Sequence, residues 1–139
     1  MGATFNHVGT CVTDLDRSTR FYEALGFEHQ TERDLTPPDA ATARLLGIDP
    51  PVGLTAVYLR LDGFVLELLH YSRADNPAGA IRPMNQPGLT HLSLTVDDLP
   101  ATLRLLESCG GTVVESSDLG IAVMVRDPDG QLIELIAKR

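Results

Sequence analysis

The amino-acid sequence predicts an α+β fold built from two tandem βαβββ modules. The chain repeats itself at a fixed spacing, each repeat opens with an alternating strand followed by a capped helix, and each closes with strands around an Asp-Gly pair. At 139 residues the chain has the length of one ordinary domain or of two small modules that share a core. We therefore expect residues 1–139 to form a single domain, with module one at about 5–71, a linker at 72–88 and module two at about 89–137.

The internal repeat covers most of both halves. The segment HVGTCVTDLDRSTRFYEALGF, which begins at His7, aligns without gaps with HLSLTVDDLPATLRLLESCGG, which begins at His91, 84 residues later. Further along, DGFVLEL (residues 62–68) aligns with DGQLIEL (residues 129–135), now 67 residues later. The smaller second separation indicates that the first half contains a longer internal loop.

The first module is predicted to begin with a strand and a helix. Apolar and β-branched residues alternate over residues 5–12, which is typical of a half-buried strand. A helix follows, with Asp14 or Asp16 as its N-cap, and ends at Gly26. The last two strands of the module are predicted to be joined by a tight turn at Asp62-Gly63, because this pair suits a two-residue hairpin.

The second module follows the same plan. Its opening strand is predicted over residues 89–96, and its helix begins with Asp98 and Pro100 and ends at Gly110. A second two-residue hairpin turn is predicted at Asp129-Gly130.

Two loops interrupt this scheme. Residues 34–53 are rich in proline and enclose a short helix predicted from about Asp39 to Leu46, which stops at Gly47. Residues 72–88 form the linker between the modules. Either loop could cover a pocket, although most such loops only connect elements.

The composition argues against several classes of function. A formal charge of −8 without a basic block makes nucleic acid an unfavourable partner. No apolar run approaches the roughly 18 residues that a membrane span needs, and the N-terminus lacks the layout of a secretory signal. We therefore expect a cytoplasmic protein without a membrane partner. Cys11 and Cys109 match no zinc or redox spacing and are interpreted as reduced thiols.

Four ionisable side chains project from otherwise apolar strands: His7, Glu67, His91 and Glu134. A buried carboxylate is costly unless it is paired or bound to a cation. A single strand histidine is usually structural and a single strand glutamate often faces solvent, but matched recurrence in the repeat favours a shared role. Two imidazoles and two carboxylates suit one divalent metal ion (Ni, Co, Zn, Mn or Fe) and leave positions open for substrate oxygens.

Three more residues share strand faces with these ligand candidates. They are predicted substrate contacts: Cys11 on the face of His7, Tyr71 on the face of Glu67, and Ser93 on the face of His91. For Cys11 the alternative role of a small apolar filler is favoured, whereas Tyr71 is expected either to contact substrate or to close the core.

At these residues the sequence resembles the vicinal-oxygen-chelate superfamily, which includes glyoxalase I, methylmalonyl-CoA epimerase, extradiol dioxygenases and fosfomycin or bleomycin resistance proteins. The resemblance runs from Phe5 to Ala137 and is carried by DLDRSTRFYEALGF, VLEL, GLTHLSLTVDDL and DPDGQLIELI. It implies that both modules together form a curved, partly closed eight-stranded mixed sheet around a metal-centred pocket. It also implies a homodimer.

Within this superfamily the four ligand candidates match glyoxalase I residue for residue. Glyoxalase I usually has an Arg four residues after the first ligand and an Asn four after the second, both of which bind glutathione; here these positions hold Cys11 and Tyr71. The segment ELLHYSRADNP, residues 67–77, is similar to methylmalonyl-CoA epimerase. The glutamate that epimerases place ahead of the third strand is absent around Pro51 and Val52.

The leading functional hypothesis is a metal-dependent glyoxalase-like lyase or isomerase that acts on a small-molecule substrate. It moves a proton next to a carbonyl through a metal-stabilised enediolate, with Glu67 or Glu134 as the base. Three alternatives remain open: a methylmalonyl-CoA epimerase-like enzyme, an Fe(II) extradiol dioxygenase-like enzyme using His7, His91 and Glu134, and a bleomycin resistance-like protein that sequesters a ligand without turnover.

Overall fold

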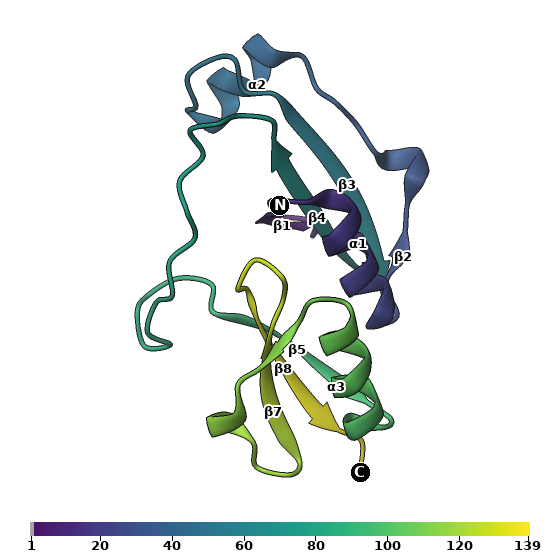
Figure 1. Cartoon of the computed structure of the whole chain (residues 1–139). Helices are drawn as coiled ribbons and strands as arrows, with labels where there is room; N and C mark the ends of the chain where they lie inside the picture. Colours follow the sequence, from purple (N-terminus) through teal and green to yellow (C-terminus); the bar gives the residue numbers. More distant parts are fainter. Residues whose placement is uncertain (1) are drawn as a thin grey trace. The chain divides into compact units, whose positions relative to one another are not determined.

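The computed structural model describes residues 2–139 and divides into two compact units, one ending at Pro77 and the other beginning at Ala78 (Figure 1). Each unit runs strand, helix, strand, strand, strand and forms its own four-stranded mixed sheet. The predicted α+β fold with two tandem βαβββ modules is confirmed, and its eight strands are divided between two hydrogen-bonded sheets.

The first unit has the sheet order β1-β4-β3-β2, in which β1 is parallel to β4 and the other pairs are antiparallel. Its elements are β1 (Val8–Cys11), α1 (Leu15–Ala24), β2 (Glu28–His29), a 3-10 turn (Thr31–Arg33), α2 (Asp39–Leu46), β3 (Leu54–Leu61) and β4 (Phe64–Tyr71). In this unit α1 contacts β2, β3 and β4 and so covers one face of the sheet (Figure 1).

The second unit has the equivalent order β5-β8-β7-β6, again with one parallel pair, β5 and β8. Its elements are β5 (His91–Val96), α3 (Leu99–Ser108), β6 (Thr112–Val113), a 3-10 turn (Glu115–Ser117), β7 (Ala122–Arg126) and β8 (Leu132–Ala137). Because the parallel strand lies beside the last strand in both units, each opening histidine segment is placed next to the strand that carries the glutamate.

Both main helices begin at an aspartate whose side chain caps the first turn. Asp14 accepts a hydrogen bond from the backbone N–H of Arg17 at 2.9 Å, which decides between the two candidate caps of the first helix. Asp98 accepts one from Ala101 N–H at 2.9 Å. Aspartate is among the strongest N-cap residues because it satisfies N–H groups that have no partner within the helix.

Replacing Asp98 with alanine is expected to lower the free energy of unfolding by about 1 kcal/mol, the usual cost of losing an N-cap. Urea unfolding followed by circular dichroism measures the change. Asp98→Asn should retain the stability because asparagine caps equally well. Asp97→Ala, one residue away and outside the cap, is the matched control. Equal losses in the two alanine variants would contradict the capping role.

The turn predicted at Asp62-Gly63 is confirmed. It joins β3 to β4, and both residues have positive φ angles, 48° at Asp62 and 79° at Gly63, as a type I′ hairpin turn requires. Consequently the β3–β4 hairpin is regular, with every residue of one strand paired with a residue of the other.

The two-residue turn predicted at Asp129-Gly130 is wrong. Residues 127–131 form a wider loop between β7 and β8, closed by the buried carboxylate of Asp127. This carboxylate accepts hydrogen bonds from the backbone N–H groups of Asp129 and Gln131 at 2.9 and 2.8 Å. The side chain of Asp127 therefore satisfies two backbone N–H donors of the wider loop.

The insertion at residues 34–53 contains the predicted helix α2, which ends at Gly47 with φ 65° in the left-handed region. The carboxylate of Asp39 accepts hydrogen bonds from the backbone N–H groups of Val52 and Gly53 at 2.8 and 3.0 Å. Arg73, which follows β4, donates to the carbonyl oxygens of Asp49 and Pro51. These hydrogen bonds connect the insertion with the segment just before β3 and with Arg73, just after β4.

The apolar core of each unit lies between its sheet and its main helix. In the first unit Leu59, Leu66 and Leu68 are fully buried on the sheet face opposite Glu67, together with Phe21 and Tyr22 of α1. In the second unit the fully buried residues are Leu106, Val123, Val125, Ile133 and Leu135. Strand alternation leaves the other face of each sheet for the ionisable residues. Within residues 2–139, no helix has the length and apolarity needed to cross a membrane.

Candidate functional site

The first unit brings His7 and Glu67 together. Glu67 lies in the middle of β4, and His7 immediately precedes β1, the parallel neighbour of β4. Nε2 of His7 lies 3.1 Å from Oε2 of Glu67, and the carboxylate side chain is only 12% exposed. The alternation that places one face of β1 and β4 against α1 thus turns both ionisable side chains to the opposite face.

The other ring nitrogen of His7 has a partner of its own. Nδ1 lies 2.7 Å from the side-chain oxygen of Asn6. An amide oxygen only accepts, so Nδ1 is the donor in this contact, and Nε2 is the ring nitrogen that faces Glu67. A ring nitrogen and a carboxylate oxygen that face each other favour a proton or a metal cation between them. The His7–Glu67 pair therefore fits a metal ion.

Tyr58 completes the surroundings of Glu67. It lies directly opposite Glu67 in the β3–β4 register, and its hydroxyl donates to Oε1 of Glu67 at 2.5 Å. Burial, and then the hydrogen bond to Glu67, raise the pKa of Tyr58 to about 12. The hydroxyl is therefore protonated at neutral pH and acts as a donor.

The second unit brings His91 and Glu134 together on β5 and β8. Nε2 of His91 lies 3.9 Å from Oε2 of Glu134, and both side chains are about 30% exposed. The hydroxyl of Ser93 donates to the same carboxylate oxygen at 2.7 Å. Nδ1 of His91 lies 2.9 Å from the hydroxyl of Thr90. This pair offers the same two kinds of ligand atom as the first pair, an imidazole nitrogen and a carboxylate oxygen. Its carboxylate is more exposed than that of Glu67.

Each unit thus supplies one imidazole nitrogen and one carboxylate oxygen that face each other. Within the described part of the chain, residues 2–139, no three His, Cys, Asp or Glu side chains form a group that could hold a metal. The four-ligand centre of His7, Glu67, His91 and Glu134 stays a prediction; the structure shows the two pairs, His7 with Glu67 and His91 with Glu134.

The predicted substrate contacts lie on these same faces. Cys11 is exposed at the end of β1, and Tyr71 ends β4. Burial raises the pKa of Tyr71, and the nearby Cys11 and Glu67 raise it further. Ser93 is a partner of Glu134 in the structure. Its substrate-binding role, like that of Cys11 and Tyr71, stays a prediction.

Sequence reasoning missed Tyr58, although the hairpin contains the signal. Once the turn is fixed at Asp62-Gly63, residues equally far on either side of it are paired, and Tyr58 and Glu67 each lie four residues from the turn. Directly paired residues point to the same face of the sheet. A tyrosine opposite a candidate ligand is therefore a predictable hydrogen-bond partner.

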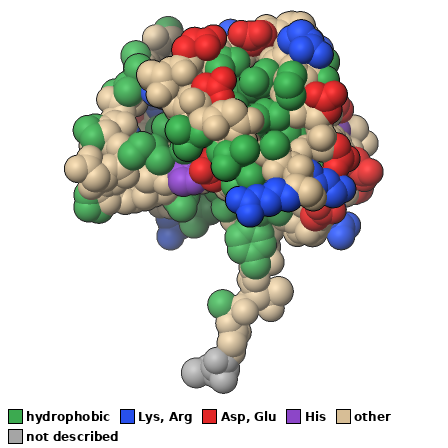
Figure 2. Space-filling view, turned by 90° about the horizontal axis from the view of Figure 1, so that it is seen from below, with side chains coloured by type: hydrophobic (Ala, Val, Ile, Leu, Met, Phe, Trp, Pro, Cys, Tyr) green, Lys and Arg blue, Asp and Glu red, His purple; other side chains and the backbone are tan. Residues whose placement is uncertain are grey.

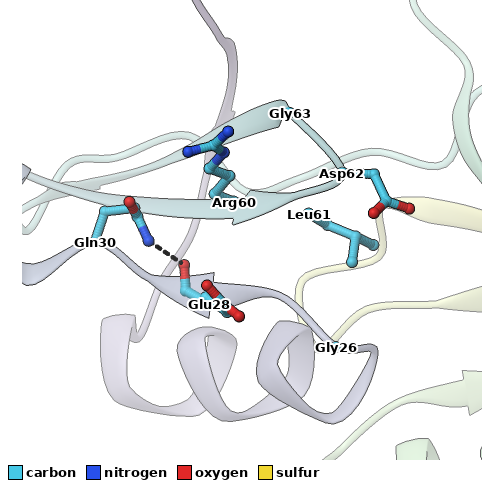
Figure 3. A pocket seen from close by; sticks show the side chains of 7 residues that line it. All are labelled: Gly26, Glu28, Gln30, Arg60, Leu61, Asp62 and Gly63. Carbon is cyan, nitrogen blue, oxygen red and sulfur yellow. Dashed lines mark hydrogen bonds between the residues drawn. The ribbon is translucent and has the colours of Figure 1, made fainter.

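One cavity of about 250 Å³ lies at the other end of the first sheet, beside the Asp62-Gly63 turn (Figure 3). Its lining residues are Gly26, Glu28, Gln30, Arg60, Leu61, Asp62 and Gly63. None of these is a predicted site residue. Glu28 and Arg60 are exposed, and the Gln30 side-chain amide is already hydrogen bonded to the Glu28 carbonyl oxygen, so the cavity shows no prepared polar site.

Lys and Arg side chains on the face shown in Figure 2 are scattered among acidic and apolar ones rather than joined into one basic band. This distribution agrees with the negative formal charge of −8. The absence of a nucleic-acid partner stays a prediction.

The sequence of the chain matches the model of a known protein superfamily. The sequence model of the Glyoxalase/Bleomycin resistance protein/Dioxygenase superfamily matches residues 4–135, a range that contains both His–Glu pairs. The chain belongs to this superfamily. The resemblance inferred from the sequence is therefore confirmed.

Individual members of the superfamily show where the similarity lies. "Probable lactoylglutathione lyase, chloroplastic" from Arabidopsis thaliana is 31% identical over 140 residues, which cover 95% of this chain and 35% of that protein. The chain thus spans about a third of the length of this curated relative.

Solved structures of the superfamily share the fold. A glyoxalase family protein from Bacillus cereus matches 96% of this chain and 92% of its own, with a TM-score of 0.78 and 20% identity. The trypanothione-dependent glyoxalase I of Leishmania major matches 98% of this chain and 87% of its own, with a TM-score of 0.67 and 23% identity. At these identities the likeness concerns the fold alone.

Proposed function

We propose that the chain is a metal-dependent, glyoxalase-like lyase or isomerase that moves a proton next to a carbonyl group. The observation that carries this proposal is the repeated His–Glu pair, His7 with Glu67 and His91 with Glu134, on parallel neighbouring strands in both units. Membership of the superfamily and the 31% identity with a lactoylglutathione lyase support it.

In this proposal His7, Glu67, His91 and Glu134 hold one divalent cation. The cation supplies Lewis-acid stabilisation of the negative charge that develops on two neighbouring substrate oxygens. Asn6 holds the proton on Nδ1 of His7 and so keeps Nε2 available as a ligand. Cys11 and Tyr71 lie on the face of the first pair and would contact the substrate.

The proton transfer itself needs a carboxylate within reach of the substrate carbon. Glu67 or Glu134 removes the proton from the hydroxyl-bearing carbon beside the carbonyl and returns it to the carbonyl carbon, while the hydroxyl proton passes to the former carbonyl oxygen, so the isomerisation needs no other reactant. Hydroxyls of Tyr58 and Ser93 each hold one oxygen of these carboxylates. The sequence and the geometry leave the choice between the two glutamates open.

The test is an isomerase assay of metal-free protein reconstituted separately with Ni, Co, Zn, Mn or Fe(II). The substrate is the hemithioacetal of methylglyoxal and glutathione, which isomerises to lactoylglutathione. Turnover that depends on added metal and stops with a chelator is expected. No turnover with any metal would count against glyoxalase chemistry on glutathione adducts.

Parallel assays separate the other candidates. Metal-dependent turnover of methylmalonyl-CoA would identify an epimerase, and oxygen uptake with a catechol and Fe(II) a dioxygenase. Tight binding of a small ligand in the presence of chelator, without turnover, would identify a sequestering protein. Each of these results would replace the proposed reaction.

A further inference from the structure

The hydroxyl group that binds the glutamate comes from a different neighbouring strand in each unit. Tyr58 on β3 pairs in register with Glu67, whereas the equivalent residue on β7 is Met124, which pairs with Glu134 and has no hydroxyl to donate. On the other side, Ser93 pairs with Glu134 and donates to it. Each carboxylate therefore receives one hydroxyl hydrogen bond, from a different neighbouring strand in each unit.

The position equivalent to Ser93 in the first unit is Gly9, which pairs in register with Glu67. A Cβ atom built at Gly9 would lie 3.3 Å from Oε2 of Glu67 and 3.2 Å from a methyl carbon of Leu69. Both contacts are tighter than ordinary van der Waals separation. A side chain at Gly9 would therefore require Glu67 and Leu69 to shift, and in this unit the hydrogen bond to Glu67 comes from Tyr58.

Tyr58 is itself firmly held by the turn that precedes α2. Its carbonyl oxygen accepts from Gln30 N–H at 2.7 Å, and its N–H donates to the Asp34 carboxylate at 3.3 Å. The guanidinium of Arg33 lies over the ring, 4.6 Å from its centre, and the ring of His7 meets it edge-on at 5.8 Å. Contacts on backbone and ring thus fix the residue that binds Glu67.

Packing limits the ring further. Tyr58 is only 7% exposed and forms a cluster with Ala56 and Val65, against which Leu69 packs. The rigid ring can therefore deliver its hydroxyl to only a small region, and that region contains Oε1 of Glu67. Ser93, in contrast, is an exposed donor on a short side chain.

We propose that Tyr58 is a positioning residue that occupies Oε1 of Glu67 and presents Oε2, together with Nε2 of His7, to the divalent cation. The inference rests on the proposed function, because it assumes that the His–Glu pairs bind a metal. It adds a residue of β3 to the machinery of the site. Hydrogen-bond partners of metal ligands orient those ligands and raise metal affinity.

The test measures Ni²⁺ affinity by competition with a coloured chelator in the full chain and in Tyr58→Phe. The variant is expected to bind Ni²⁺ about 10- to 100-fold more weakly, the usual effect of losing such a partner. Tyr22→Phe, the same chemical change in α1 on the far side of the sheet, should keep the parent affinity. Thermal unfolding of each variant verifies that it is folded.

A spectroscopic readout separates positioning from a general loss of structure. The chain has three tyrosines and no tryptophan, so its near-ultraviolet absorbance difference on Ni²⁺ addition reports tyrosine surroundings. The difference should be present in the parent and in Tyr22→Phe and should be lost in Tyr58→Phe. Tyr58→Met, which reproduces the residue of β7, provides a second variant if the first is unstable.

The outcomes distinguish the two proposals. If the parent binds Ni²⁺ and both Tyr58 variants bind it equally tightly, the positioning role is overturned and the proposed function stands. If the parent binds none of the five metals, the proposed function fails and the inference falls with it. Weaker binding in the Tyr58 variants alone, with the tyrosine signal lost, supports both.

Discussion

Replacing Glu67 or Glu134 with glutamine is expected to lower kcat by roughly 100- to 10,000-fold, the range that a positioned acid–base group contributes. Glutamine keeps the size of the side chain and an oxygen that can accept from Tyr58 or Ser93, so the fold should be retained. It cannot take up a proton at neutral pH. Steady-state kinetics on the hemithioacetal, with circular dichroism as the folding measurement, test both variants.

Glu28→Gln is the matched control for these two variants. It makes the same change of charge on β2 of the first sheet, at an exposed residue that lines the separate cavity of Figure 3. Its kcat should equal that of the parent chain. Unchanged turnover in both Glu67→Gln and Glu134→Gln would show that neither carboxylate takes part in the reaction. A loss of turnover confined to Glu28→Gln would indicate that the active site is the cavity that Glu28 lines.

The glutamine variants also separate the roles of the two carboxylates. Glu67 is 12% exposed and Glu134 is 30% exposed on their side chains, and the former is held by a buried tyrosine. If only one variant also loses metal, its glutamate acts mainly as a ligand. The variant that keeps its metal and loses turnover then identifies the base.

The sequence was sufficient to predict those features that depend on local chemistry and on the repeat. Asp98 caps its helix, Gly47 ends α2 in the left-handed conformation and the Asp62-Gly63 turn closes a regular hairpin, because each of these positions strongly favours a small set of residue types. The repeat also predicted that the two histidines, and likewise the two glutamates, occupy equivalent places in the two modules, as the matching strand pairs show.

Two features that depend on particular side-chain contacts were harder to predict. The Asp-Gly pair at Asp129 has the same local preference as the pair at Asp62, yet the Asp127 carboxylate binds the backbone of the loop and prevents a tight turn. A tyrosine such as Tyr58 is common in buried strands, and only the strand register shows that its hydroxyl lies beside Glu67. The preference of an Asp-Gly pair does not include the side chain of Asp127, and strand propensity does not include the register that pairs Tyr58 with Glu67.

The second large effect is expected in the metal content of the purified chain when its histidine ligands are replaced. The purified chain should carry roughly one transition metal ion, since four donors of mixed nitrogen and oxygen type suit a single centre. A double variant, His7→Ala with His91→Ala, should carry none after the same purification, because each substitution removes the imidazole from one of the pairs. Inductively coupled plasma mass spectrometry measures the metal, and circular dichroism verifies the fold.

His70→Ala is the control for this experiment. His70 lies on β4 only three residues from Glu67, and strand alternation turns it to the opposite face of the sheet. Its removal should leave the metal content unchanged. If the double variant loses the metal and His70→Ala keeps it, the ligands lie on the sheet face of Glu67. The single variants add a further distinction. If His7→Ala and His91→Ala each abolish binding, the two pairs act on one ion, whereas half occupancy in each would indicate two independent sites and would overturn the four-ligand centre.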